Sequence, residues 1–200
     1  MIYYYPNRPI LISPDNPSVE LKSNDINWDA EIKWNGDRLV LQKQENPNKK
    51  NFENFVFFNR ENDVLKYAPI KELMEELKAL NLPPETQLDG ELLHNKTKKI
   101  KNRIIFYDIY ILGGHNVTGI LQERRDILKL LFNDKKFKHI EIAERFETGF
   151  TEKFKEVITR EECEGLVLKN KTGKIVFNTI KSPDVCWQNK IRREHKNYKF

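Results

Sequence analysis

Apolar residues recur at helical spacing in three segments of the chain, and this spacing predicts helices over 69–80, 121–132 and 151–162. The third segment begins at Thr151, whose hydroxyl suits an N-cap. Shorter runs rich in β-branched and aromatic residues, bounded by turn residues, predict strands. These strands cover 28–34, 38–42, 55–59, 87–94, 103–112, 139–145, 165–170, 174–178 and 185–192. Strands outnumber helices and do not alternate with them, so the pattern favours an α+β fold over a doubly wound parallel sheet.

The composition is that of one folded domain. The 200 residues are 38% hydrophobic and 32% charged, and no repeat or linker divides them, so we expect a single domain over 1–200. No apolar run approaches the roughly 18 residues that span a bilayer, and the N-terminus lacks a signal-peptide pattern, so we expect a cytoplasmic protein with no membrane partner. The two cysteines, Cys163 and Cys186, lack the spacing of zinc ligands.

The balance of charge suits a partner that carries phosphate. Lys and Arg number 35 against 30 Asp and Glu, which gives a formal net charge of +5. The last twenty residues are locally basic, with six Lys or Arg against two Asp or Glu, and they include Lys196 and Lys199. This end of the chain is therefore expected to contact a polynucleotide backbone.

A lysine in an unusual setting is the first candidate for chemistry. The chain has neither a P-loop nor a dinucleotide-binding glycine motif. Instead, Lys33 precedes a turn at Asn35-Gly36 and is followed by Arg38. Glu31 and Lys33 share one face of the predicted strand. A lysine amine attacks only when it is neutral, and a neighbouring cation such as Arg38 favours that form. The alternative is a surface hairpin with solvated charges.

Four later segments carry further polar or aromatic candidates, three inside predicted strands and one, Glu164, directly before the strand predicted at 165–170. They are the acid pair Asp89 and Glu91, the aromatic Tyr107, the single acid Glu164, and the basic pair Lys190 and Arg192. Taken alone, each has an ordinary structural explanation, such as a turn, a core residue, a strand end or a solvated edge strand. Their order along the chain, after Lys33, is that of a complete set for handling a nucleoside triphosphate.

Together these motifs resemble the covalent nucleotidyltransferases, which include DNA ligases, RNA ligases and messenger RNA capping enzymes. The resemblance spans 31–193, most of the chain. It implies an α+β, ATP-grasp-like core of antiparallel sheets flanked by helices, with a nucleotide pocket between the sheets. Family members usually continue into an OB-fold domain, and because only eight residues follow Arg192, no C-terminal OB-fold domain is expected.

The resemblance also implies a role for each matching residue. Lys33 would attack the α-phosphate of the nucleotide, expel pyrophosphate and retain the nucleotide through a phosphoramidate bond. The nucleotide-binding residues would be Glu31, Ile32, Arg38, Arg60, Glu91, Tyr107, Val167, Lys190 and Arg192. Glu31 would read the purine edge, and Tyr107 and Val167 would cover the two faces of the base. Mg²⁺ would be held by Glu91 and Glu164.

Two residues depart from the family pattern. Asn35 stands where most members have Asp, and Arg192 replaces the second lysine of the closing motif, which keeps the charge. The E-R-R-D-I-L segment at 123–128 and the C-E-G-L-V-L-K segment at 163–169 favour an ATP-dependent DNA ligase. We therefore expect a monomer that uses ATP and seals nicked duplex nucleic acid, DNA in preference to RNA. The alternatives are an RNA ligase, which Asn35 favours, and a partial nucleotidyltransferase that binds nucleic acid without sealing it.

Overall fold

The strands of the computed structural model form two sheets, and the structure describes residues 1–45 and 54–193. One sheet has the order β1-β11-β10-β2-β9, and the other has the order β4-β3-β5-β6-β7, with β8 beside β6. The strands of the first sheet are β1 Arg8–Leu11, β2 Trp28–Trp34, β9 Arg145–Phe146, β10 Cys163–Asn170 and β11 Asp184–Arg192. Those of the second are β3 Asp37–Lys43, β4 Phe55–Phe58, β5 Thr86–Leu93, β6 Arg103–Leu112, β7 His115–Asn116 and β8 Ile140–Ile142.

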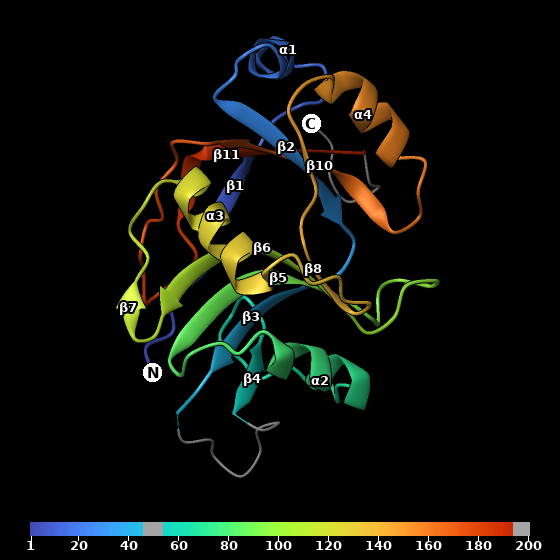
Figure 1. Ribbon diagram of the computed structural model, residues 1–200. Helices are drawn as coiled ribbons and strands as arrows, with labels where there is room; N and C mark the ends of the chain where they lie inside the picture. Colours follow the sequence, from blue (N-terminus) through green and yellow to red (C-terminus); the bar gives the residue numbers. More distant parts are fainter. Residues whose placement is uncertain (46–53, 194–200) are drawn as a thin grey trace.

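Most neighbouring strands are antiparallel, except that β1 pairs parallel with β11 and β8 parallel with β6. The chain passes from one sheet to the other at the turn between β2 and β3, so the two sheets meet at this turn (Figure 1). The predicted α+β class with largely antiparallel sheets is therefore confirmed.

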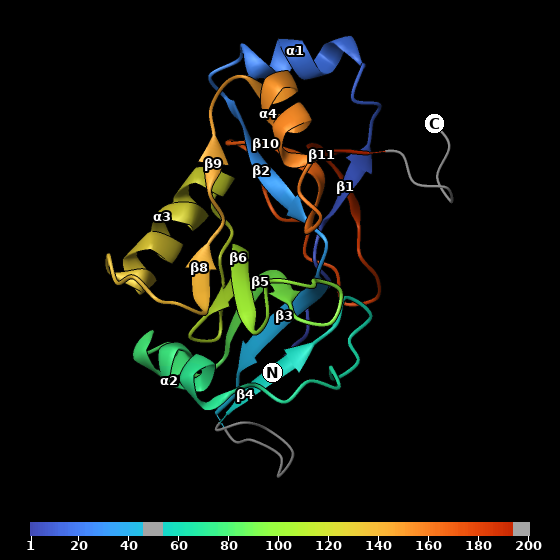
Figure 2. The same cartoon turned by 90° about the vertical axis from the view of Figure 1, so that its right-hand side faces the viewer.

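Four helices cover the sheets in the part of the chain that the structure describes: α1 Pro17–Ser23, α2 Lys71–Ala79, α3 Leu121–Phe132 and α4 Phe150–Val157. α1 and α4 pack together over the first sheet, whereas α2 and α3 lie against the second (Figure 2). Each sheet has its own apolar core, with Phe150 and Leu166 in the first and Leu73 and Phe106 in the second. No helix within 1–45 and 54–193 is long and apolar enough to cross a membrane.

Two fully buried arginines on α3 join the sheets. Arg124 binds Asp108 of β6 with its Nε 2.7 Å from the carboxylate. Arg125 donates to the Tyr107 carbonyl of β6 at 3.2 Å and lies 2.7 Å from the carboxylate of Glu31 on β2. A guanidinium has five donors in a fixed plane, which lets one side chain satisfy groups on different strands. The E-R-R-D segment therefore fixes the position of α3 against both sheets.

Most predicted elements are confirmed, several of them at the predicted bounds, but three predictions are wrong. The segment 174–178 is not a strand and makes one isolated bridge, from Lys174 to Ile120. The Asn7 side chain satisfies both backbone groups of Val176, accepting from its N–H at 2.9 Å and donating to its C=O at 2.8 Å. A side chain therefore takes the place of a neighbouring strand.

The other two corrections concern 139–145 and 151–162. The first segment divides into β8 and β9, which pair with strands of different sheets. The second is the shorter helix α4, whose N-cap is Gly149 and not Thr151. Gly149 has a φ of 69°, which glycine adopts at little cost, and Thr159 closes the far end by donating to the Glu156 carbonyl. The sequence pattern also missed β1, α1 and β7.

Candidate active site

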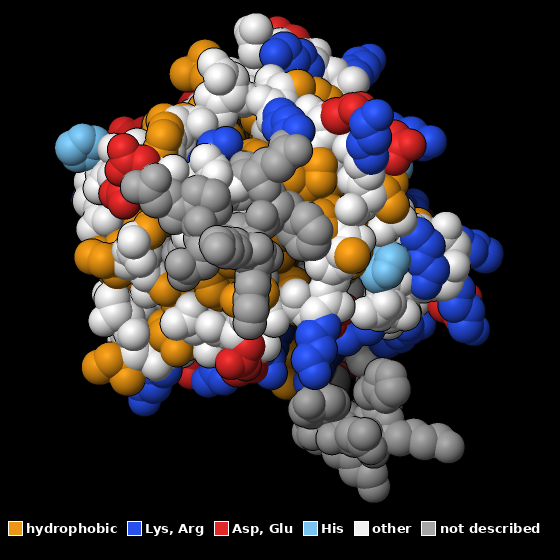
Figure 3. All heavy atoms as spheres, turned by 90° about the horizontal axis from the view of Figure 1, so that it is seen from below, with side chains coloured by type: hydrophobic (Ala, Val, Ile, Leu, Met, Phe, Trp, Pro, Cys, Tyr) orange, Lys and Arg blue, Asp and Glu red, His pale blue; other side chains and the backbone are white. Residues whose placement is uncertain are grey.

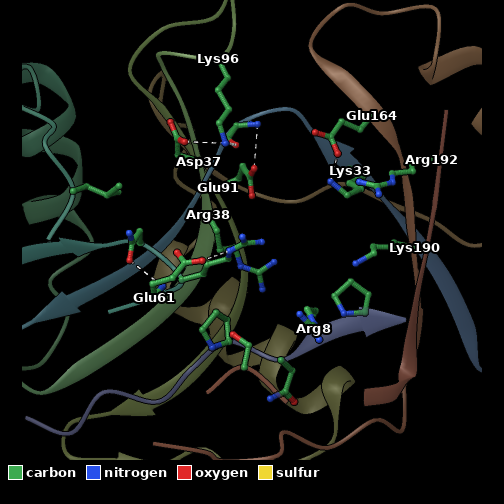
Figure 4. A pocket seen from close by; sticks show the side chains of 18 of the residues that line it. Arg8, Lys33, Asp37, Arg38, Glu61, Glu91, Lys96, Glu164, Lys190 and Arg192 are labelled. Carbon is green, nitrogen blue, oxygen red and sulfur yellow. Dashed lines mark hydrogen bonds and ion pairs between the residues drawn. The ribbon is translucent and has the colours of Figure 1, made fainter. Parts of the chain in front are cut away.

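A cavity of about 650 Å³ lies where the two sheets meet (Figure 4). Its walls come from β1, β2, β10 and β11 of the first sheet and from β3 and β5 of the second. Eight Lys or Arg side chains and four Asp or Glu side chains line it among the described residues. These cations are Arg8, Lys33, Arg38, Arg60, Lys96, Lys190, Arg192 and Arg193. An excess of positive charge in a cleft attracts anions, phosphates in particular.

Lys33 lies near the end of β2 and reaches across to Glu164 at the start of β10. The two side chains form an ion pair, and each is about one quarter exposed, at 23% and 28%. The register places Lys33 opposite Gly165, the residue after Glu164. Gly165 has a φ of 155°, and a Cβ there would lie 2.1 Å from the Ile191 carbonyl oxygen of β11. A glycine is therefore required where β2, β10 and β11 bring their polar groups together.

Glu91 enters the cavity from the second sheet. Its carboxylate accepts a hydrogen bond of 3.1 Å from the backbone N–H of Gly36, in the turn after Lys33. A Cβ on Gly36 would lie 2.6 Å from the Glu91 Cγ, so the turn can approach this closely only because it carries no side chain. Burial raises the pKa of Glu91 to about 7, although the positive charges of Lys33 and Arg38 oppose this shift.

Arg38 lines the cavity from β3, opposite Glu91 in the β3–β5 register. Its Nε donates to Asp89 Oδ1 at 2.6 Å, and its Nη2 binds the other carboxylate oxygen. Its guanidinium also lies 5.4 Å from the centre of the Tyr107 ring. This two-pronged pair gives the buried carboxylate of Asp89 a partner and holds Arg38 at the edge of the cavity.

Lys190 and Arg192 project from alternate positions of β11 into the cavity from the first sheet. Burial lowers the pKa of Lys190, and the charges of Lys33, Arg192 and Arg8 lower it further. Lys33, Arg192 and Arg8 are therefore close enough to Lys190 to repel its charge. Such a cluster is stabilised when an anion binds between its members.

Seven of the predicted site residues line this one cavity: Lys33, Arg38, Arg60, Glu91, Glu164, Lys190 and Arg192. Arg60 is its most exposed member and pairs with the neighbouring Glu61. The predicted residues Glu31, Ile32, Tyr107 and Val167 do not line the cavity. The basic residues Lys196 and Lys199 lie outside the described part of the chain.

The residues expected at a base form a separate, closed cluster around Glu31. The Glu31 carboxylate lies 2.7 Å from both Arg125 and Lys169, and all three side chains are at most 5% exposed. Val167 lies directly opposite Glu31 in the β2–β10 register, and the Lys169 ammonium is 5.2 Å from the centre of the Tyr107 ring. Lys169 therefore occupies the space between the carboxylate and the aromatic ring.

Comparison with known proteins rests on structure, since no family model matches the chain and no curated protein matches its sequence. The structure of mycobacterial DNA ligase D complexed with ATP and MES superposes with a TM-score of 0.67 at 16% identity, covering 94% of this chain. A Lig E DNA ligase gives a TM-score of 0.57 at 14% identity, covering 93% of this chain and 69% of its own. The ligase domain of M. tuberculosis LigD gives 0.54 at 15% identity, covering 92% and 58%.

The chain has a DNA ligase fold. The resemblance predicted from the motifs is thus confirmed at the level of the fold. The chain spans 60% of the length of the mycobacterial ligase D chain.

The ligase fold brings residues to the cavity that the motifs did not indicate. Arg8, Asp37, Lys96 and Arg193 line it, and Lys96 binds Asp37 at 2.9 Å and the Gly36 carbonyl at 2.9 Å. Lys96 lies in a lysine-rich segment, which is visible in the sequence. The sequence alone does not show that this segment lies beside the cavity. Arg8 had no such signal, because the pairing of β1 with β11 joins the two ends of the chain.

Two of the four acidic side chains at the cavity, Glu91 and Glu164, fit a hard divalent cation. Glu91 and Glu164 both line it, and carboxylate oxygens are the ligands that Mg²⁺ prefers. Within the described residues there is no group of three or more His, Cys, Asp or Glu arranged to hold a metal ion. Mg²⁺ is commonly held by one or two carboxylates together with substrate phosphates and water, so two carboxylates suffice.

Proposed function

We propose that this chain is the catalytic core of an ATP-dependent DNA ligase, with Lys33 as the nucleophile. One observation carries the proposal: in a DNA ligase fold, Lys33, Glu164 and Glu91 meet the basic pair of β11 in a single cavity. A nucleophile, two acidic groups and clustered cations are the parts that phosphoryl transfer requires.

In the first step the Lys33 amine attacks the α-phosphorus of ATP. The nitrogen–phosphorus bond forms as the bond from the α-phosphorus to the bridging oxygen breaks, and the electron pair leaves with pyrophosphate. The Lys33 ammonium loses one proton before attack, because an ammonium has no lone pair, and the nitrogen releases a second proton to solvent once the nitrogen–phosphorus bond has formed. Glu164 is already paired with Lys33 and can accept the first proton. Lys190 and Arg192 stabilise the charge that develops on the phosphate oxygens without having to move far.

Glu91 and Glu164 are the residues that would hold Mg²⁺. A bound Mg²⁺ would neutralise phosphate oxygens and favour attack on phosphorus. Lys33 contacts one oxygen of the Glu164 carboxylate, Oε2, so the other oxygen would serve a cation while the ion pair is kept. Glu91 would be oriented for the same cation by its hydrogen bond from the Gly36 N–H.

The polynucleotide would contact the rim of the cavity. Lys and Arg side chains gather along the right-hand edge of the face shown in Figure 3, with some acidic side chains among them. The β5–β6 connection also carries Lys96, Lys98, Lys99 and Lys101. Phosphate backbones bind such surfaces without regard to sequence. The role of the chain would be to join a 3′-hydroxyl to a 5′-phosphate at a nick, as DNA repair and replication require.

A nick that already carries a 5′-adenylyl group tests the sealing reaction apart from the first step. The protein is incubated with Mg²⁺ and adenylylated nicked DNA, or the same nick in RNA, without ATP. Sealing of the DNA faster than the RNA supports the proposal, and Arg160→Ala, outside the cavity, serves as the matched control. Sealing of RNA alone identifies an RNA ligase. Binding of both without sealing of either contradicts the proposal and favours a nucleotidyltransferase that only binds nucleic acid.

A further inference from the structure

Arg8 is a cation of the cavity wall that belongs to none of the sequence motifs from which the site was predicted. It begins β1, which runs parallel to β11, with Arg8 opposite Asp184 and Leu11 opposite Lys190. Arg8 lines the same cavity as Lys33 and Lys190 (Figure 4). The N-terminal segment is fixed there by the Arg8 backbone N–H, which donates to the Pro183 carbonyl at 2.8 Å. Backbone pairing with β11 therefore fixes Arg8 in the wall of the cavity.

Asp184 orients the Arg8 guanidinium through two of its N–H donors. The Arg8 Nε lies 2.6 Å from one carboxylate oxygen and the Nη2 lies 3.0 Å from the other. A guanidinium carries five N–H donors, so this pair leaves the edge formed by Nη1 and Nη2 for a second anion. Both side chains are about half exposed, at 55% and 54%, so an anion can reach that edge.

The position of Arg8 along the cavity indicates which phosphate it would meet. Lys190 lies between Lys33 and Arg8 in Figure 4, and its pKa is lowered by the charges of both. In an in-line displacement, the leaving group departs on the side of the phosphorus opposite the nucleophile. With the α-phosphate beside Lys33 and Lys190, the leaving pyrophosphate would point toward Arg8.

We propose that Arg8 binds the β- and γ-phosphates of the nucleoside triphosphate and stabilises the pyrophosphate as it leaves. This inference rests on the proposed function. The bond that breaks joins the α-phosphorus to the oxygen bridging to the β-phosphorus, and its electron pair goes to that oxygen. Arg8 offers two parallel donors to the charge that collects there, which suits the geometry of phosphate.

Binding of inorganic pyrophosphate tests this role without requiring catalysis. Titration calorimetry is performed on the wild-type protein and on Arg8→Ala, Arg8→Lys and Arg160→Ala. Arg160 is a matched control because it is also an exposed arginine paired with an acid, Glu156, outside the cavity. We expect Arg8→Ala to weaken pyrophosphate binding by about tenfold or more, Arg8→Lys to weaken it less, and Arg160→Ala to leave it unchanged. Equal affinity of Arg8→Ala and wild type overturns the inference, as does a wild type that binds no pyrophosphate.

Kinetic measurements separate this inference from the proposed function. Arg8→Ala should raise the pyrophosphate concentration needed to remove AMP from the adenylylated protein and regenerate ATP. Sealing of a pre-adenylylated nick should keep its rate. Slower sealing with unchanged pyrophosphate binding would overturn the inference and assign Arg8 to a polynucleotide phosphate. Pyrophosphate binding that depends on Arg8, in a wild type that forms no covalent nucleotide adduct, would support the Arg8 site and contradict the ligase proposal.

Discussion

The Lys33 ammonium is ion-paired with the Glu164 carboxylate across the register of β2 and β10. The pair holds the proposed nucleophile at the cavity wall and gives it a partner that can accept its proton. It also means that one carboxylate serves both Lys33 and any cation at the phosphates. The first step of the proposed reaction therefore depends on the chemistry of Glu164 as much as on that of Lys33.

Replacing Glu164 with Gln should reduce formation of the covalent nucleotide adduct by roughly a hundredfold. The amide keeps the size of the side chain but neither accepts the Lys33 proton nor binds a cation well. Because both partners of the pair are partly exposed, thermal unfolding should change little. The measurement is the rate of label transfer from ATP at saturating Mg²⁺. A Glu164→Gln variant with the wild-type rate would remove Glu164 from the mechanism.

Glu91 should make stability depend on pH. Its pKa is about 7 in the folded protein and 4.5 in the reference state, so the folded state binds more protons between these values. The free energy of unfolding should therefore fall as the pH rises through this window. Urea unfolding at about pH 5 and about pH 8 should show a larger fall for wild type than for Glu91→Gln. Parallel falls in the two proteins would show that Glu91 is not the group responsible.

A methyl group at Gly165 should disturb both the fold and the site. The Cβ of Gly165→Ala would meet the Ile191 carbonyl oxygen at 2.1 Å and push β11 away from β10. We expect a loss of about 1 to 3 kcal/mol in the free energy of unfolding. Adduct formation should also fall, because the basic pair of β11 moves away from Lys33. Denaturant unfolding and label transfer measure the two effects. Gly113→Ala is the control, because Gly113 also has a positive φ, of 57°, but its Cβ would make only ordinary contacts with Pro83 at 3.7 Å. Equal stability of the two variants would contradict the packing described here.

Local patterns predicted those elements whose periodicity is intrinsic to their own residues. The strands Trp28–Trp34 and Arg103–Leu112 and the helix Leu121–Phe132 have the predicted bounds, because one face or both faces of each is apolar. β1 was missed because an edge strand of four residues is defined by its pairing with β11, near the other end of the chain. The start of α1 is visible in the sequence, because Asn16 is a favourable N-cap residue and Pro17 suits the first position of a helix.

Local motifs likewise predicted only part of the candidate site. The order of motifs indicated the phosphate end of the cavity, from Lys33 to Arg192, and the structure brings these residues together. The motif order did not indicate that Glu31 would be buried between Arg125 and Lys169. The three residues come from three different elements, so no single segment of the sequence predicts their contact. The roles of Glu31, Tyr107 and Val167 at a base remain predictions.

The most direct test of the central claim is covalent labelling. The protein is incubated with Mg²⁺ and ATP or GTP labelled at the α-phosphate, and the products are separated on a denaturing gel. We predict an acid-labile label from ATP that is absent from Lys33→Ala and retained by Arg160→Ala. No label from either nucleotide, or a label that persists in Lys33→Ala, would contradict the account.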